Sequence, residues 1–273
     1  MKTKTMAIAS LVALSVSAPA FAAKEAAANK SAKESKSIIQ QLKDSPFSLT
    51  ADLETVTDSK VETYNGSSLT GYLSYKLSDT EKIKSMVSMD NSKNGDEFEN
   101  SFSSAYIGYQ KGGLFKDNKL GLSINAQARL YKYNEATKNS ASRDGKAHAR
   151  LTLVKKVSDK VTVAGLGMYN EYIRTSGKDS VTRRNATALV STSYGHSDKL
   201  SFINDISVTG SYKKNSESYS VGLTPQISYA VNDTLATTLY YSTTLMKSND
   251  GQLFAKNWLE NGVIALNLSY SVF

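Results

Sequence analysis

The sequence contains no cysteine among its 273 residues, and it has two histidines, three prolines and one tryptophan. Without cysteine no disulfide can form, so the chain must be stabilised by packing or by a membrane. Neither histidine, His148 or His196, lies at a spacing typical of a Ser/His/acid triad, and no cluster has metal-ligand spacing. The sequence therefore predicts no catalytic residue, no metal and no cofactor, and it argues against an enzyme.

Long hydrophobic runs are also scarce. Beyond residue 22, no stretch reaches the roughly 18 apolar residues that a membrane-spanning helix needs, which excludes a helical membrane protein. Positive charge is in excess, with a formal net charge of +8. The basic residues are scattered over predicted loops and turns without a stripe of interleaved aromatics, so no nucleic-acid partner is predicted.

The first residues have the pattern of an export signal. Residues 1–5 are short and basic, residues 6–18 are mostly apolar, and Ala20-Phe21-Ala22 has the small-x-small form of a cleavage site. This arrangement is typical of a secretory signal peptide, which is too short to span a membrane as a helix. We expect residues 1–22 to be removed on export.

Residues 23–46 differ from the rest of the chain in composition, since Ala, Lys, Ser and Glu dominate them. Ser37 and Gln40 fit a capping box in front of a narrow apolar stripe. The sequence predicts a periplasmic leader that is partly disordered and partly helical. Two interpretations remain open: a solvated tether, or a segment that plugs the domain or contacts the cell wall.

From residue 47 the hydrophobic period changes to two, which is the period of a strand with one apolar face. Residues 120–130 show it most clearly, because Leu, Ile and Ala alternate there with Gly, Ser, Asn, Gln and Arg. Residues 47–273 contain twelve candidate strands of this kind: 47–56, 68–77, 82–90, 101–110, 119–132, 147–157, 161–173, 185–194, 200–212, 219–231, 234–246 and 262–273.

The connections between these strands alternate in length. Five are short turns with an Asp, a residue that favours turns by bonding its own backbone: 78–81, 116–118, 158–160, 197–199 and 232–234. They alternate with longer polar connections at 57–67, 91–100, 133–146, 174–184 and 247–261, and a brief one at 213–217. Short turns at one end, long loops at the other and an even strand count predict a single transmembrane antiparallel up-and-down β-barrel of about twelve strands.

Aromatic residues on the apolar faces support a barrel over a soluble β-sandwich. Strands of about ten residues suffice to cross a bilayer at a tilt, and aromatics gather where such strands leave it. The predicted girdle at the short-turn end contains Phe47, Tyr75, Tyr109, Tyr194, Phe202, Tyr229 and Tyr270, and the opposite girdle contains Tyr169, Tyr212 and Tyr219.

The signal peptide, the period of two and the final Tyr270-Ser-Val-Phe273 resemble a bacterial outer-membrane β-barrel protein. The resemblance implies an outer-membrane location, lipid as a partner, and a monomer. It also implies that the last strand, through Tyr270 and Phe273, is read by the barrel-assembly machinery and closes the barrel against the first strand. One departure is that Val272, not Phe273, is in step with the outward residues.

The predicted inner faces carry Ser, Thr, Asn, Gln and Gly together with a set of charged residues. If the hairpin of residues 119–157 is symmetric, Arg129 lies directly opposite Arg150. Like charges in that position repel, so a negative group is expected between them. That group is either an internal carboxylate or an anionic solute at a cationic constriction. The candidate lumen residues are Lys76, Lys84, Arg129, His148, Arg150, Arg183, Asp52, Glu54 and Asp205.

Some stretches leave alternatives open. Around Val161 the two faces are both apolar, which indicates either a bulge or a locally apolar lumen, and Pro225 inside a strand predicts a bulge. Phe254 and Trp258 are expected to anchor the last long loop at the membrane, to fold into the lumen or to dock a partner. The leading functional hypothesis is a porin-like channel for the passive diffusion of small hydrophilic solutes, with a mild preference for anions. The alternative is a structural or recognition barrel with a filled lumen and functional loops.

Overall fold

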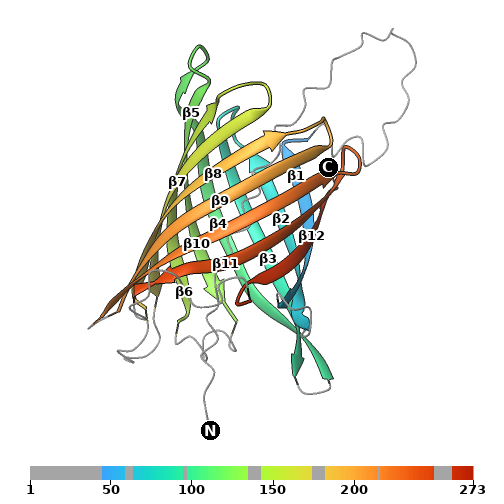
Figure 1. Ribbon diagram of the computed structural model, residues 1–273, viewed down its shortest axis with the longest axis vertical. Coiled ribbons are helices and arrows are strands. Elements are labelled where there is room, and N and C mark those ends of the chain that lie inside the picture. The colour runs from blue at the N-terminus through green and yellow to red at the C-terminus, as the bar shows by residue number, and fades with distance from the viewer. Residues whose placement is uncertain are drawn as a thin grey trace. The chain divides into compact units, whose positions relative to one another are not determined.

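The computed structural model describes residues 45–58, 64–94, 97–134, 143–173, 182–213, 216–248 and 260–272. The twelve strands of these residues form one closed antiparallel barrel, which confirms the predicted fold class (Figure 1). The signal peptide, the leader up to residue 44, Phe254, Trp258 and Phe273 lie outside the described residues. The strands are β1 Phe47–Asp58, β2 Tyr64–Lys76, β3 Glu81–Asn94, β4 Glu97–Asp117, β5 Leu122–Tyr133, β6 Gly145–Lys156, β7 Val161–Ile173, β8 Arg184–Gly195, β9 Leu200–Tyr212, β10 Glu217–Ala230, β11 Leu235–Lys247 and β12 Val263–Ser271.

The last strand closes the barrel against the first, as the sequence predicts. Figure 1 shows β12 beside β1, and their ladder places Leu53 opposite Leu268 and Ala51 opposite Tyr270. Beyond the strand, the amide of Val272 donates to the carbonyl of Leu49 at 2.8 Å. Closure leaves no open sheet edge, so each strand has a hydrogen-bonding neighbour on both sides, as a lipid environment requires.

Four of the short turns share one hydrogen-bond pattern. In each, the amide of the residue that begins the turn donates a hydrogen bond to the carbonyl four residues later. The side chain of the next residue, the second of the turn, accepts a hydrogen bond from the amide two residues after itself. The turns lie where the sequence predicts them, but in these four the accepting side chain is a Ser or an Asn and not the Asp on which the prediction relied. The second residues are Ser78, Ser158, Ser197 and Asn232.

Two of these turns also carry an ion pair between a strand end and the turn. Lys76 lies 2.7 Å from Asp79, and Lys156 lies 2.8 Å from Asp159. The hydrogen bond from each lysine, followed by its charge, lowers the pKa of both aspartates. All four groups are exposed at the rim, so the pairs contribute little to stability.

The connection between β3 and β4 differs from the prediction. Residues 91–100 were expected to form a long loop, but β3 and β4 continue their ladder to Asn94 and Glu97 and project beyond the long-loop rim (Figure 1). A strand outside the bilayer needs no lipid-facing side, so its sequence loses the alternation of apolar residues while its backbone pairing persists. Hydrophobic periodicity therefore underestimates the length of this hairpin.

The outer surface of the barrel is apolar around its whole circumference. Ile107 on β4, Val190 on β8 and Leu69 on β2 expose 62%, 53% and 52% of their surface. An exposed apolar area of this extent is tolerated in lipid but not in water. Most predicted girdle residues face outward and expose 37% to 48% of their surface, whereas Tyr212 is half-buried beside Arg184. Their role as interfacial anchors stays a prediction. The exposed girdle members are Phe47, Tyr75, Tyr109, Tyr169, Tyr194, Phe202, Tyr219, Tyr229 and Tyr270.

Pro225 does not cause the bulge that the sequence predicts. The ladder from β10 to β9 runs through Pro225 opposite Asn204 without a shift, and the shift toward β11 lies instead at Val221 and Gly222. Proline has no amide hydrogen, and the nitrogen of Pro225 lies on the side of β11. At this position β10 therefore has no ladder pair with β11, but its register does not change. Among the described residues, no helix is long and apolar enough to cross a membrane.

Candidate functional site: the barrel lumen

The charged residues of β5 and β6 meet on the inner face of the barrel with a register that differs from the symmetric prediction. Arg129 lies opposite His148, and Arg150 lies opposite Gln127. The strands begin their ladder at Lys132 and Gly145, which shifts the pairing by two residues and keeps every inward side chain inward. The prediction that Arg129 and Arg150 are direct cross-strand partners is therefore wrong. The two arginines are diagonal neighbours.

Neutral groups hold both arginines. Arg129 donates through Nη1 to the Tyr131 hydroxyl at 2.9 Å and through Nη2 to Gln127 Oε1 at 2.6 Å. Its guanidinium also lies 4.7 Å from the centre of the Tyr106 ring, a favourable cation–π contact. Arg150 donates through Nε to Thr152 Oγ1 at 3.1 Å. Each positive charge is therefore oriented without being neutralised by these partners.

A glycine makes room for Arg129. Gly108 lies between Lys84 and Arg129 in the ladder of β3, β4 and β5. A Cβ atom at this glycine would lie only 2.8 Å from Arg129 Cγ, so any other residue would push the arginine away. Lys84 and Arg129 consequently share one row of the inner wall, with no side chain between them on β4.

His148 is fixed by a chain of amides. The Asn170 amide donates to Asn185 Oδ1 at 2.6 Å, and the Asn185 amide donates to the Tyr172 hydroxyl at 3.0 Å. This direction turns Asn170 Oδ1 toward His148 Nδ1, which donates to it at 2.9 Å. The other ring nitrogen, His148 Nε2, is buried without a partner in the described part of the chain, as are Gln127 Nε2 and Arg129 Nε.

Lys146 belongs to the same group, although it was not among the predicted lumen residues. Its ammonium lies 4.5 Å from the centre of the Tyr131 ring, one row beyond Arg129 and His148. The alternation that selected His148 and Arg150 extends to Lys146, but the predicted strand began one residue too late to include it. We call Lys84, Arg129, Lys146 and Arg150 the cationic sector. Electrostatic repulsion links each of the other three to Arg129.

The inward carboxylates also have neutral partners. The Tyr240 hydroxyl donates to Glu54 at 2.7 Å, and the Gln226 amide donates to Asp205 at 2.8 Å. Ser269 donates a hydrogen bond to Asp52. Asp52 and Asp90 both repel Glu54, and Asp90 was not among the predicted lumen residues. Within the described residues, these carboxylates form no ion pair with the cationic sector, so they do not support the alternative of an internal carboxylate between Arg129 and Arg150.

Two predicted lumen residues lie away from this group. Lys76 is at the short-turn rim with Asp79, and Arg183 is exposed at the opposite rim, where its backbone extends the ladders from β7 and β9. A strand position predicts which face a side chain occupies, but its depth depends on the tilt of the barrel. Lys76 and Arg183 are therefore rim charges.

An apolar wall adjoins the cationic sector on the inner face. It consists of Val154 on β6, Ala164, Leu166 and Met168 on β7, and Leu189 on β8, which are contiguous in the ladders. The β7 ladders have no register shift on either side, so a bulge does not explain the apolar residues around Val161. The lumen is locally apolar there, which was the other alternative.

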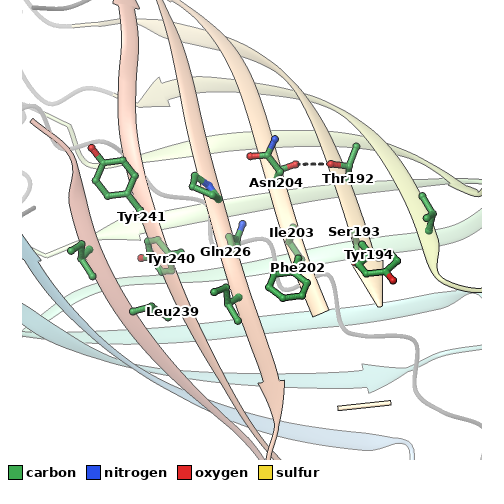
Figure 2. A pocket seen from close by; sticks show the side chains of 14 residues that line it. Thr192, Ser193, Tyr194, Phe202, Ile203, Asn204, Gln226, Leu239, Tyr240 and Tyr241 are labelled. Carbon is green, nitrogen blue, oxygen red and sulfur yellow. Dashed lines mark hydrogen bonds between the residues drawn. The ribbon is translucent and has the colours of Figure 1, made fainter. Parts of the chain in front are cut away.

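A hollow of about 800 Å³ lies on the wall from β7 to β12 (Figure 2). Most of the side chains that line it face outward, and Tyr194, Phe202, Leu239 and Tyr241 give it an apolar surface. Thr192 donates to the Asn204 carbonyl at 3.4 Å within it. Because most of its lining side chains face outward, this hollow is distinct from the lumen.

The inner wall thus carries a positively charged sector on β3, β5 and β6, inward carboxylates on β1, β3 and β9, and an apolar region on β6 to β8. Among the described residues, no group of His, Cys, Asp or Glu side chains could hold a metal ion.

No family model and no curated protein matches the sequence. Among solved structures, the barrel is similar to the KdgM porin, with a TM-score of 0.51 and 11% identity over 81% of this chain and 98% of that one. It is also similar to the NanC porin, with a TM-score of 0.53 and 8% identity over 81% and 98%. An outer-membrane channel from Pseudomonas putida F1 gives a TM-score of 0.53 and 11% identity over 82% and 95%. At these identities the likeness shows the fold, which is that of outer-membrane porins.

Proposed function

We propose that this protein is an outer-membrane channel for the passive diffusion of small hydrophilic solutes, with a preference for anions. The observation that carries the proposal is the cationic sector, whose four charges form no ion pair with a carboxylate among the described residues. Fixed charges on the wall of a narrow pore raise the local concentration of ions of the opposite sign. The proposal assigns no catalytic residue and no cofactor.

The fold agrees with this assignment. One solved structure of the same fold is the KdgM porin in complex with disordered oligogalacturonate, with a TM-score of 0.51 and 11% identity over 81% of this chain and 98% of that one. A polymer of acidic sugars needs positive charge along its path. The cationic sector would supply such charge here.

A specific observation favours a second candidate function. Several inward side chains are deeply buried, among them Tyr240 at 6%, Tyr106 at 6% and Met86 at 9% exposure. Tightly packed inward residues are typical of a barrel that is filled by its own side chains. Such a barrel would act as a structural or recognition protein through its long loops.

Conductance of the purified mature protein in a planar bilayer separates the two. We expect stepwise ion currents, and a reversal potential in a KCl gradient that shows chloride to be more permeant than potassium. A barrel that resists proteolysis in vesicles and yet passes no current would contradict the channel and support the filled barrel.

We further propose that the terminal strand is recognised by the assembly machinery of the outer membrane. The proposal is supported by the place of Tyr270, which faces outward with 48% exposure on the strand that closes the barrel against β1. Replacing both Tyr270 and Phe273 by alanine is expected to lower the amount of folded barrel in cells several-fold, measured by heat-modifiable mobility in membrane fractions. The same variant should refold in detergent as the unaltered chain does. Normal cellular levels would contradict the recognition role.

A further inference from the structure

Positive charge at the short-turn rim is concentrated on one side of the barrel. The turns at 118–121 and 157–160 adjoin, because the amide of Lys156, beside one turn, donates to the carbonyl of Gly121 in the other at 2.9 Å. The other three short turns hold more acidic than basic residues. Four exposed lysines in or beside the two adjoining turns form no ion pair with a carboxylate among the described residues. We call them the lysine patch: Lys116, Lys119, Lys155 and Lys160.

Lys155 presents its charge to the outside of the barrel. Alternation along β6 places it on the outer face, and its ladder partners are Leu122 on β5 and Val163 on β7. Along its own strand it lies between Leu153 and Val157, which expose 42% and 57% of their surface. Because these neighbours are apolar and no described carboxylate pairs with the lysine, a counter-ion for its ammonium group would come from a molecule outside the barrel.

The turn between β4 and β5 adds exposed apolar surface to the lysine patch. Figure 1 shows this hairpin projecting beyond the other short turns. Asp117 holds the tip, because its Oδ1 atom accepts the amides of Lys119 at 2.9 Å and Leu120 at 3.1 Å. Leu120 exposes 59% of its surface, and Leu114 exposes 51%. The tip therefore presents a positive charge and an apolar side chain at adjacent positions.

The lysine patch lies where the headgroups of a membrane are expected. Val161 is the cross-strand partner of the predicted girdle residue Tyr194, and Lys160 is one residue closer to the rim. On β4, Lys116 lies beyond the predicted girdle residue Tyr109. A polar headgroup layer borders the hydrocarbon core directly outside such a girdle. A lysine at this depth reaches a headgroup with its ammonium while its methylene groups stay on apolar surface.

We propose that the lysine patch binds anionic phospholipids of the leaflet that the short turns face. The lysines of the two adjoining turns contact the phosphate, and Leu120 and Val157 contact the apolar part of the lipid. Charge selects an anionic lipid over a zwitterionic one, because a zwitterionic headgroup brings a positive charge of its own. This inference concerns the outer surface and goes beyond the proposed channel function.

Phosphatidylglycerol and phosphatidylcholine with the same acyl chains test the inference, since they differ in the net charge of the headgroup. The purified mature barrel in non-ionic detergent is titrated with each lipid, and the bound lipid is counted by native mass spectrometry. Each lysine near an anionic headgroup favours binding by about fivefold. Phosphatidylglycerol is therefore expected to bind at about one tenth of the concentration that phosphatidylcholine requires.

Variants assign the preference to the lysine patch. Lys119→Gln with Lys155→Gln is expected to weaken phosphatidylglycerol binding by on the order of tenfold and phosphatidylcholine binding by less than about twofold. Lys76→Gln with Lys199→Gln is the matched control, because it removes an equal number of positive charges beside other short turns. This control should keep the preference. Leu120→Ser should weaken the binding of both lipids by a similar factor, because it removes apolar contact without changing the charge.

Three results would overturn the inference. The first is equal binding of the two lipids by the wild-type protein; binding of a polyglutamate peptide in that case would indicate an acidic protein as the partner. The second is an equal loss of phosphatidylglycerol binding in the matched control, which would mean that the overall charge attracts the lipid. The third is complete displacement of phosphatidylglycerol by millimolar inorganic phosphate together with unchanged binding in Leu120→Ser, which would indicate a site for free phosphate.

Discussion

Ile206→Arg is expected to lower the free energy of unfolding of the barrel in lipid by about 2–4 kcal/mol, the cost of a cation near the bilayer midplane. Ile206 faces outward with 47% exposure, between Val190 on β8 and Leu223 on β10. Along β9 it is four residues from Phe202 in one predicted girdle and six from Tyr212 in the other. It therefore lies near mid-depth.

The measurement is reversible urea unfolding of the protein inserted in lipid vesicles, followed by tryptophan or tyrosine fluorescence. Ile206→Met is the control, because it keeps an apolar side chain of similar size and should shift the free energy of unfolding by less than about 1.5 kcal/mol. Equal stability of the arginine variant and the wild-type protein would show that this face does not contact lipid.

The fold could be predicted because a bilayer imposes the same rule on every strand. Lipid outside and polar groups inside force a period of two, and the tight turns need residues such as Ser197 and Asn232 that bond their own backbone. Closure of β12 on β1 follows from the absence of tolerated edges in lipid. These constraints act locally or on every strand, so one sequence suffices to read them.

The site was predicted less well, because its geometry depends on register and depth. A shift of two residues keeps Arg129 and Arg150 on the inner face, so the alternation of side chains cannot detect it. Positions at the rim and positions deeper in the barrel also look alike in sequence, which is why Lys76 and Arg183 were grouped with Arg129. The missed Lys146 and Asp90 follow the same alternation, but they lie near predicted strand ends, where apolar periodicity fades.

The corrected register sharpens the test of ion selectivity. Arg129→Ser with Arg150→Ser removes two of the four charges of the cationic sector, and we expect the ratio of chloride to potassium permeability to fall clearly. The effect should shrink in 1 M salt, where the Debye length is about 3 Å and fixed charges are screened over short distances. Reversal potentials in KCl gradients of low and high mean concentration measure both effects.

The matched control is Lys76→Ser with Arg183→Ser, which removes an equal number of positive charges from the two rims. Since selectivity is set where the pore is narrowest, this control is expected to shift the reversal potential less than the inner pair does. The unfolding midpoint of the inner variant should change little, because Arg129 and Arg150 are bonded to Tyr131, Gln127 and Thr152 and leave no carboxylate stranded when removed. An unchanged reversal potential together with a much lower midpoint would mean that the two arginines serve packing in a filled barrel, and the channel hypothesis would fail for this site.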